Sequence, residues 1–351
     1  MVASGRILAP DSVQEINDLY YNMGLTDGLP IIPPTPESVG EMIRASGRDP
    51  QEVIGLVPPR SGIATVENIA TNAIMAGCKP AHLPVVIAAL EACLEDTFNL
   101  YGVQNTTHPT TPLVMVHGPV ARSLEVNSGH DCLGHGVQAN ATIGRALSLI
   151  LLNIGGGTRR ATHGQPGKYS FCFAESEDQS PWPPFHADRG FGSDASAVSV
   201  FGAGGSMNMR PYPRRGRDVL AGIARMMALG GSPRCHGYAL IIINPEHARL
   251  VAEDGFSKES ARDYLFEYAR VRPSGFMEEV AQTWIEERPL EHMDVRNVIG
   301  EIGPDTFVPS ADFPEHLYIV VAGGSGGHSV FIPLCFTQPT PVVTKALREF
   351  R

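Results

Sequence analysis

Apolar stretches alternate with polar breaks marked by glycine or proline along the whole chain, and their periods separate helices from strands. Continuous apolar runs of a few residues are typical of buried strands, whereas apolar positions three and four apart are typical of helices. The expected strands are 112–117, 238–243 and 317–322, with an alternating apolar segment at 171–175. The expected helices are 11–23, 35–46, 66–76, 84–96, 139–154, 218–229, 257–270, 276–286 and 342–350. Buried strands that alternate with helices predict a layered α/β fold.

The N-terminal part differs from the rest, because prolines at positions 30, 33, 34 and 36 forbid a continuous helix there. They favour an extended strap that packs over another element or a neighbouring subunit. No low-complexity linker follows. We therefore expect N-terminal helices with a proline-rich strap in residues 1–60, and a single α/β catalytic domain in residues 61–351.

Two segments resemble each other along their length. Residues 113–129 read LVMVHGPVARSLEVNSG and residues 239–255 read ALIIINPEHARLVAEDG. Both contain a strand, a proline turn, a short helix with an arginine, and a final glycine. This pattern predicts a weak internal repeat of an α/β unit, with chance similarity as the alternative. A repeat would place the ends of similar strands around one site.

Composition narrows the class of protein. Of 351 residues, 43% are hydrophobic and 18% charged, which is typical of a folded globular chain. The net charge of −10 argues against nucleic acid or an anionic membrane as a partner. No apolar run approaches the roughly 20 residues that span a bilayer. The six cysteines form no CxxC pair and no signal-peptide pattern is visible, so we expect a cytoplasmic protein with free thiols, and a homo-oligomer.

Residues 127–190 contain many His, Cys, Asn, Lys and Glu side chains, which a hydrophobic core does not need. We therefore interpret this region as part of the active site. The helix that begins near position 139 could hold a carboxylate or phosphate at its N-terminus. No P-loop and no dinucleotide-binding glycine pattern is present, so no nucleotide site is expected. The residues expected to bind a small, polar or anionic substrate are Asn105, His108, Asn127, Ser128, Asn140 and Arg145.

Thiol chemistry is one hypothesis for catalysis. If residues 168–172 are extended, Lys168 and Cys172 share a face, and the ammonium group would lower the pKa of the thiol. His163, Glu175 and His328 would then transfer protons. On this hypothesis, Cys172→Ser abolishes turnover and preserves the fold. The alternative is an inert cysteine buried between two phenylalanines.

A metal ion is the second hypothesis and the one cofactor left open. His130, Cys132 and His135 are ligand types that suit zinc or another transition metal. Their spacing in a glycine-rich loop matches no ligand pattern that we can derive. The alternative is that they face substrate or fill a tight loop. His163, His186 and His328 are further ligands that such a site could draw upon.

Four strings carry a resemblance to a known family: GLTDGLPIIPPTPE, ANATIGRALSLILLNIGG, QPGKYSFCFAE and SPWPPFH. Together they resemble a poorly characterised bacterial family that is often grouped with UGSC-type (Sec/Cys-Gly-Ser-Cys) proteins. Those proteins are similar to a subunit of glycine reductase, which implies thiol-linked cleavage with a small thiol- or selenol-containing partner protein. This chain has no Cys-Gly-Ser-Cys motif, so the partner would have to supply that redox centre.

The sequence thus favours an enzyme that cleaves a carbon–heteroatom bond of a small molecule, a lyase or hydrolase coupled to thiol redox. A metal-dependent hydrolase is the first alternative. A non-catalytic scaffold subunit of a larger complex is the second.

Overall fold

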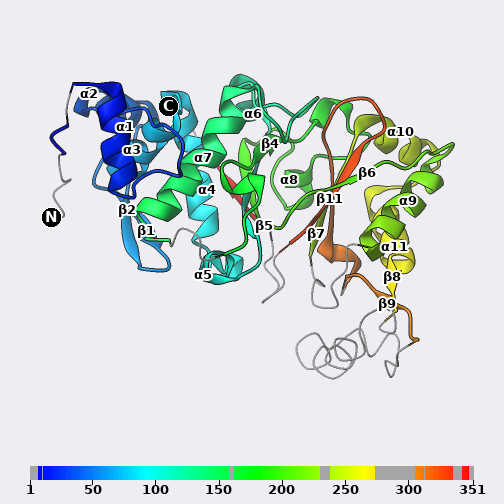
Figure 1. Ribbon diagram of the computed structural model, residues 1–351. Helices are drawn as coiled ribbons and strands as arrows, with labels where there is room; N and C mark the ends of the chain where they lie inside the picture. The colour runs from blue at the N-terminus through cyan, green and yellow to red at the C-terminus, as the bar shows by residue number, and fades with distance from the viewer. Residues whose placement is uncertain are drawn as a thin grey trace.

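The computed structural model describes residues 7–9, 11–157, 162–229, 238–272, 305–311, 313–334 and 342–347. Two four-stranded sheets pack face to face, and helices cover the outer face of each sheet (Figure 1). The predicted layered α/β fold is confirmed as an arrangement of helices, sheet, sheet and helices. The expected helix 276–286 lies outside the described residues.

The first sheet has the strand order β12-β5-β3-β4. Strand β3 pairs parallel with β4 and antiparallel with β5, and β5 pairs antiparallel with β12. The strands are β3 (Thr111–His117), β4 (Cys172–Ala174), β5 (Ala197–Ala203) and β12 (Val343–Ala346). The prediction of a helix at 342–350 is wrong where the structure describes this segment, because 343–346 complete the sheet beside β5.

The second sheet has the order β10-β7-β11-β6 and repeats the same pairing: one parallel pair, then two antiparallel pairs. Its strands are β6 (Met207–Met209), β7 (Ala239–Ile243), β10 (Leu317–Val321) and β11 (Ser329–Pro333). Strands β3 and β7, the two strands of the predicted repeat, occupy equivalent positions in the two sheets.

The fourth strand of each sheet comes from the other half of the chain. Strand β6 follows β5 in sequence and pairs with β11, whereas β12 follows β11 and pairs with β5. The two repeat units therefore exchange an edge strand. This exchange joins the two sheets in addition to the core between them.

Side-chain alternation along the strands builds three cores. In β3, Val114 and Val116 face the helices of the first outer layer, while Leu113 and Met115 face the second sheet. The first outer layer contains α3 (Val66–Ala76), α4 (Leu83–Cys93) and α7 (Gln138–Asn153), and the second contains α9 (Gly216–Leu229), α10 (Pro245–Glu253) and α11 (Lys258–Tyr268). None of the helices in the described part of the chain is both long and apolar enough to cross a membrane.

The N-terminal segment packs on the first helical layer. It contains α1 (Val13–Asn22), α2 (Pro36–Ser46) and the antiparallel pair β1 (Val53–Val57) and β2 (Gly62–Thr65). Ile31 and Met42 are buried in the same core as α3, α4 and α7. The first 60 residues therefore share a core with the rest of the chain.

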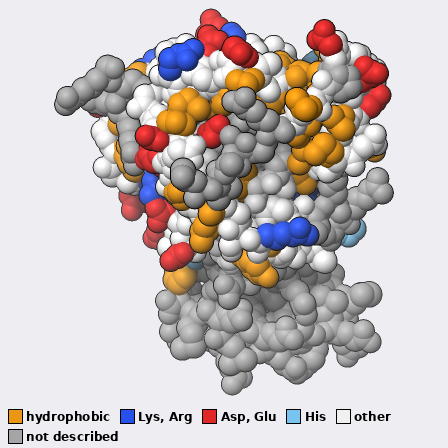
Figure 2. All heavy atoms as spheres, turned by 90° about the vertical axis from the view of Figure 1, so that its left-hand side faces the viewer, with side chains coloured by type: hydrophobic (Ala, Val, Ile, Leu, Met, Phe, Trp, Pro, Cys, Tyr) orange, Lys and Arg blue, Asp and Glu red, His pale blue; other side chains and the backbone are white. Residues whose placement is uncertain are grey.

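Much of the exposed apolar surface lies on this N-terminal segment. Of the large hydrophobic side chains that are exposed in the described residues, ten of fifteen come from residues 7–63. Hydrophobic side chains are visible among polar ones on this face of the molecule (Figure 2).

Short elements complete the fold. They are α5 (Leu100–Asn105), α6 (Pro119–Ser123), α8 (Phe185–Asp188) and the two-stranded pair β8 (Arg270–Val271) with β9 (Val308–Pro309). Helix α6 directly follows β3, and α8 follows the segment after β4. Both lie near the edge of the first sheet where its parallel strands end.

Candidate metal centre

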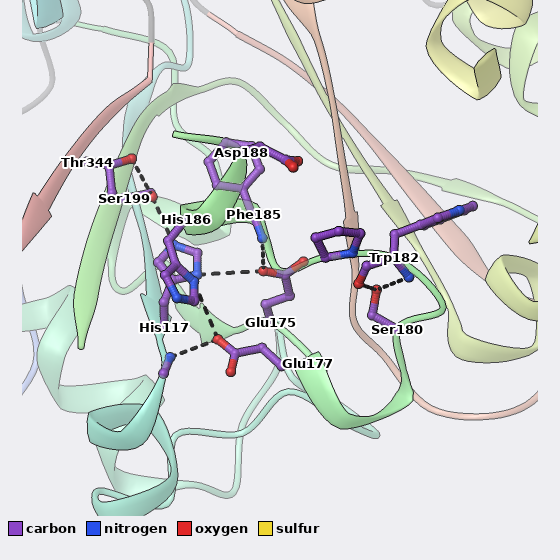
Figure 3. Close-up of polar contacts among 12 residues, drawn as sticks. His117, Glu175, Glu177, Ser180, Trp182, Phe185, His186, Asp188, Ser199 and Thr344 are labelled. Carbon is purple, nitrogen blue, oxygen red and sulfur yellow. Dashed lines mark hydrogen bonds and ion pairs between the residues drawn. The ribbon is translucent and has the colours of Figure 1, made fainter. Parts of the chain in front are cut away.

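Four acidic and histidine side chains meet at the carboxyl ends of β3 and β4 (Figure 3). His117 is the last residue of β3, Glu175 and Glu177 follow β4, and His186 lies in α8. Because β3 and β4 are parallel, their carboxyl ends lie at the same edge of the sheet. The ligand atoms of the four side chains lie within 4.8 Å of one another, so the group could hold one metal ion.

The spacing within this group suits a shared cation better than direct hydrogen bonds. His117 Nδ1 lies 3.7 Å from Glu175 Oε2, and His186 Nδ1 lies 3.7 Å from Glu177 Oε1. Both distances exceed the normal hydrogen-bond range. Two ligands that each lie about 2.1 Å from a tetrahedral metal are about 3.4 Å apart. These two separations are close to that value, and atoms of the group that lie up to 4.8 Å apart would have to move closer to bind one metal.

The group is buried and lacks hydrogen-bond partners. The side chains of His117, Glu175 and His186 have no exposed surface, and that of Glu177 is 14% exposed. Within the described residues, His117 Nδ1, Glu175 Oε1 and both ring nitrogens of His186 have no hydrogen-bond partner. A buried polar atom without a partner costs about 1–3 kcal/mol. Burial, and then the neighbouring His117, lowers the pKa of His186, which favours the neutral imidazole that metals bind.

A chain of hydroxyl groups orients His117. Its Nε2 lies 2.8 Å from Ser199 Oγ, and Ser199 Oγ lies 2.8 Å from Thr344 Oγ1 (Figure 3). With the Nε2 proton donated to Ser199 and the serine proton donated to Thr344, the lone pair of Nδ1 faces the carboxylates. Metal-binding histidines are oriented in this way by an outer partner on the other ring nitrogen.

Backbone groups orient the two carboxylates. Phe185 N–H donates to Glu175 Oε2 at 2.7 Å, and Gly118 N–H donates to Glu177 Oε1 at 2.8 Å. Arg122 Nη1 donates to the other oxygen of Glu177 at 3.2 Å. Gly118 has φ of 72°, and a Cβ there would lie 2.1 Å from the carbonyl oxygen of Ala195. Glycine is therefore required at the turn that brings this N–H to Glu177.

A cavity of about 160 Å³ adjoins the group. Its wall is formed by α6 with the turn that follows it, and by residues 174–179. Glu175 and Glu177 belong to this wall, so a metal bound between them could also bind water or substrate from the cavity. A catalytic metal site differs from a structural one by such an accessible position.

Of the residues expected to be catalytic, the structure places Glu175 in this group. Cys172 is buried in β4, where burial and, to a lesser extent, Cys78 raise the pKa of its thiol. Lys168 Nζ instead donates to Thr162 Oγ1, and burial lowers its own pKa. The prediction that Lys168 lowers the pKa of Cys172 is wrong, because desolvation of the thiolate dominates.

Lys168, His163 and His108 lie near one another at the opposite end of β3. Burial, then the charges of Lys168 and His163, lower the pKa of His108. His163 N–H donates to Thr107 O, just before β3 begins. The seven residues of β3 span roughly 20 Å at about 3.3 Å per residue, so these groups are far from the His117 end of the strand.

The structure does not bring His130, Cys132 and His135 together as a ligand set. Among the described residues, the group that includes His117 is the one whose ligand atoms converge. The side chain of His135 is 97% exposed and contacts Asp131. Cys132 is buried, which raises the pKa of its thiol to about 11. His130 packs on Gly324, where a Cβ would lie 1.9 Å from His130 Nδ1.

Several residues expected to bind substrate have structural contacts instead. Asn140 donates to the carbonyls of Asn127, Cys132 and Cys172 and accepts from Asn127 N–H, which uses the hydrogen-bonding capacity of its amide. Asn127 closes its own turn through Gly129 N–H and His130 O. Asn105 donates to Tyr101 O within α5. Ser128, however, lines the cavity.

Arg145 contacts the N-terminal strap. Its guanidinium donates two hydrogen bonds to Asp27, at 2.8 and 2.9 Å, and a third to Pro30 O. The two charged side chains are 14% and 12% exposed. Arg145 therefore has an ion-pair partner within the chain, and its contact with an anionic substrate stays a prediction.

His328 lies next to a second contact between a buried histidine and a serine, in the other half of the chain. There the buried His247 lies 2.9 Å from Ser329 Oγ, as His117 lies 2.8 Å from Ser199 Oγ. His328 itself is exposed and its Nδ1 lies 2.9 Å from Asn208 Oδ1. Ala322, Gly323 and Gly324 follow β10, whereas Glu175, Ser176 and Glu177 follow β4. Within the described residues, the carboxylate beside His247 is that of Glu246, which accepts a hydrogen bond from Gly326 N–H.

Sequence reasoning did not select His117 or Glu177. His117 is the polar end of an apolar strand directly before Gly-Pro, and Glu177 forms a Glu-x-Glu pair with Glu175. These two sequence patterns could have pointed to His117 and Glu177 as site residues. No family model matches the chain, and no curated protein sequence matches it either.

Proposed function

We propose that this protein is a metal-dependent hydrolase of small molecules, with His117, Glu175, Glu177 and His186 as the ligands of one divalent metal. The observation that supports this most is the buried set of donor atoms without hydrogen-bond partners, held in place by an outer layer of hydrogen bonds. Two imidazoles and two carboxylates suit zinc, iron(II) or manganese(II).

The chemistry follows from a metal beside a cavity. His117, Glu175, Glu177 and His186 would hold the metal, and the metal would supply a Lewis acid that lowers the pKa of a bound water beside the cavity. Hydrolysis would then add the oxygen of that water to the carbon. The heteroatom would leave with the bonding electrons and take up the proton of the water.

This proposal is preferred to thiol catalysis because burial raises the pKa of Cys172. It is preferred to a scaffold role because a scaffold has no need of buried donor atoms without partners. The thiol- or selenol-containing partner, the homo-oligomer and the cytoplasmic location stay predictions.

Metal analysis tests the first part of the proposal. We expect about one equivalent of metal per chain in the purified protein, and less than a tenth of that in His186→Gln and in Glu177→Gln. The matched control His135→Gln removes an exposed histidine and should keep the full metal content. Circular dichroism verifies that the variants are folded. A folded wild type without metal after incubation with zinc, manganese and iron(II) would refute the metal centre.

Hydrolysis tests the second part. p-Nitrophenyl acetate serves as a probe of metal-bound hydroxide, beside a panel of small amides and amidines. We expect activity that a chelator removes and the metal restores. A fully loaded protein that hydrolyses none of these would mean that the metal is structural, and would overturn the proposed reaction.

A further inference from the structure

We infer that Lys258, in the second half of the chain, is a positioning residue of the metal centre: it holds the short helix α8 where His186 can bind the metal. This role rests on the proposed function and places part of the control of the site in the other half of the chain. Two hydrogen bonds from one buried ammonium group to residues at either end of α8 carry it.

Helix α8 supplies two parts of the centre. Its first residue, Phe185, donates its N–H to Glu175 Oε2 at 2.7 Å. Its second residue, His186, brings Nδ1 to 3.7 Å from Glu177 Oε1. A helix of a single turn has too few internal hydrogen bonds to be stable by itself. The position of α8, and of both groups, therefore depends on what the helix contacts.

Lys258 Nζ contacts both ends of this helix. It donates to the carbonyl oxygen of Pro183 and to Asp188 Oδ2, each at 2.7 Å. Pro183 lies two residues before α8, and Asp188 is its last residue. One ammonium group therefore fixes the start and the end of the turn that carries His186.

The location of Lys258 is unfavourable for a lysine without such partners. It is the first residue of α11, where the N-terminal end of the helix dipole disfavours a positive charge. The residue is 8% exposed, and lysine is almost never buried to this extent unless it is paired. Within the described residues, its partners are Pro183 and Asp188. These two contacts explain a burial that helix formation alone would oppose.

A second contact attaches the same segment to the second half of the chain. Trp182 Nε1 donates at 3.1 Å to the carbonyl oxygen of Phe256, in the connection between α10 and α11, and the Trp182 side chain is buried in the core of the second helical layer. In Figure 3 the side chains of Trp182 and Asp188 are directed away from His117. The segment thus faces the metal ligands on one side and the second half of the chain on the other.

Lys258→Met tests the role, because it removes the ammonium group and keeps much of the apolar part of the side chain. The variant should stay folded, since Phe185 keeps α8 attached to the core between the sheets. Its zinc affinity should fall about 10–100-fold, the size expected when the support of metal ligands is removed. Competition with a fluorescent chelator measures the affinity. Equal zinc affinity in the variant and the wild type would overturn the inference.

Lys79→Met is the matched control, because it removes an exposed lysine between α3 and α4 and should keep the zinc affinity. The visible absorption of bound cobalt(II) reports the ligand geometry. At full loading it should change in Lys258→Met and stay unchanged in the control. Lys258→Arg keeps a charged donor and should recover most of the lost affinity. An unaltered cobalt spectrum together with no recovery by arginine would show that the loss of affinity is general destabilisation.

Asp188→Asn is a second variant that decides the question if Lys258→Met does not fold. It removes the charged acceptor at the end of α8 and keeps the Pro183 carbonyl. Zinc affinity should fall by about tenfold. A folded Asp188→Asn protein with wild-type affinity would refute the positioning role.

Hydrogen exchange in the metal-free protein tests the same contact without a metal. Peptides covering residues 180–189 should exchange about tenfold faster in Lys258→Met, while those covering β3 and β5 exchange as in the wild type. Equally faster exchange in all peptides would show that Lys258 is structural for the whole fold.

The outcomes also separate the two proposals. If the wild type binds no metal, the hydrolase proposal fails, and hydrogen exchange still decides whether Lys258 holds α8. If metal binds with the same affinity in wild type and Lys258→Met, the metal centre stands and the positioning role is wrong.

Discussion

At the residue scale, the candidate centre depends on which atom of each side chain is left without a partner. His117 uses Nε2 for Ser199 and leaves Nδ1 facing Glu175. Glu175 uses Oε2 for a backbone N–H and leaves Oε1. The side chains are thus held in place while donor atoms remain available, which is the arrangement expected of preorganised metal ligands.

Ser199→Ala should weaken metal binding without removing a ligand. His117 would lose the partner that orients it, and loss of an outer-layer partner typically lowers metal affinity by about 10–100-fold. Competition with a fluorescent chelator measures the affinity. Ser123→Ala, which removes an exposed serine that donates to the Val120 carbonyl within α6, is the control. An unchanged affinity in Ser199→Ala would show that the hydroxyl chain does not support the site.

Cys172→Ser should retain metal-dependent hydrolysis, contrary to the sequence-based hypothesis that it abolishes turnover. Burial disfavours the thiolate, so Cys172 is unsuited to act as a nucleophile. Activity of the variant is compared with that of the wild type at equal metal content. A loss of more than a hundredfold in the fully loaded variant would return the thiol to the mechanism.

The buried thiols should make folding stability fall in alkali. Burial raises the pKa of Cys78 to about 12 and also raises the pKa of Cys93 and Cys172. Thiols in the unfolded chain ionise from about pH 8.5, so stability is full below that pH and falls as pH rises towards the folded-state pKa values. Each such thiol should contribute about 1.4 kcal/mol per pH unit once the unfolded form is ionised.

Urea unfolding at pH 7.5, 9 and 10 measures this dependence. Cys93→Ala should reduce the slope of folding stability against pH by the contribution of one thiol. An unchanged slope in that variant would contradict the assignment.

At the element scale, the parallel pair β3 and β4 brings the ligands together. His117 and Glu175 are distant in sequence, and the shared carboxyl edge of the two strands places them side by side. Arg145 is also placed by its element: it lies on α7 and forms an ion pair with Asp27 of the proline-rich strap. The strap is therefore held by an ion pair as well as by apolar contacts.

Arg145→Met should destabilise the fold by about 3 kcal/mol, because it leaves the mostly buried Asp27 carboxylate without its partner. The double variant Asp27→Asn/Arg145→Met removes both charges and should recover part of the loss. Urea unfolding measures both variants. Wild-type stability combined with a selective rise in KM would instead support the original expectation that Arg145 binds substrate.

At the scale of the whole molecule, two similar units are joined by exchanged edge strands and by a core between their sheets. The two units differ in the residues that follow their parallel strands. The first has carboxylates after β4, and the second has glycines after β10. The homo-oligomer expected from the sequence stays a prediction that light scattering can test.

The strand exchange should make unfolding a single cooperative transition. Each sheet contains one strand from the other half of the chain. When one unit unfolds, the other therefore loses its edge strand. Differential scanning calorimetry of the metal-free protein should show one peak whose calorimetric and van't Hoff enthalpies agree. Two separate transitions would show that the units are independent.

The sequence by itself determined the fold class, most of the longer helices and the strands β3, β4, β7 and β10, because apolar periodicity reports directly on burial. It also indicated the β3 and β7 repeat and selected Glu175. It missed the strands β5, β6, β11 and β12, which pair antiparallel with strands distant in sequence.

Only the tertiary structure decided which polar residues meet. His130, Cys132 and His135 are close in sequence but diverge, whereas His117 and His186 are 69 positions apart and converge. The physical reason is that a site is built from strand ends and turns whose neighbours are set by sheet pairing. Burial likewise reversed the expectation for Cys172, because desolvation is a property of the packed fold and not of nearby sequence.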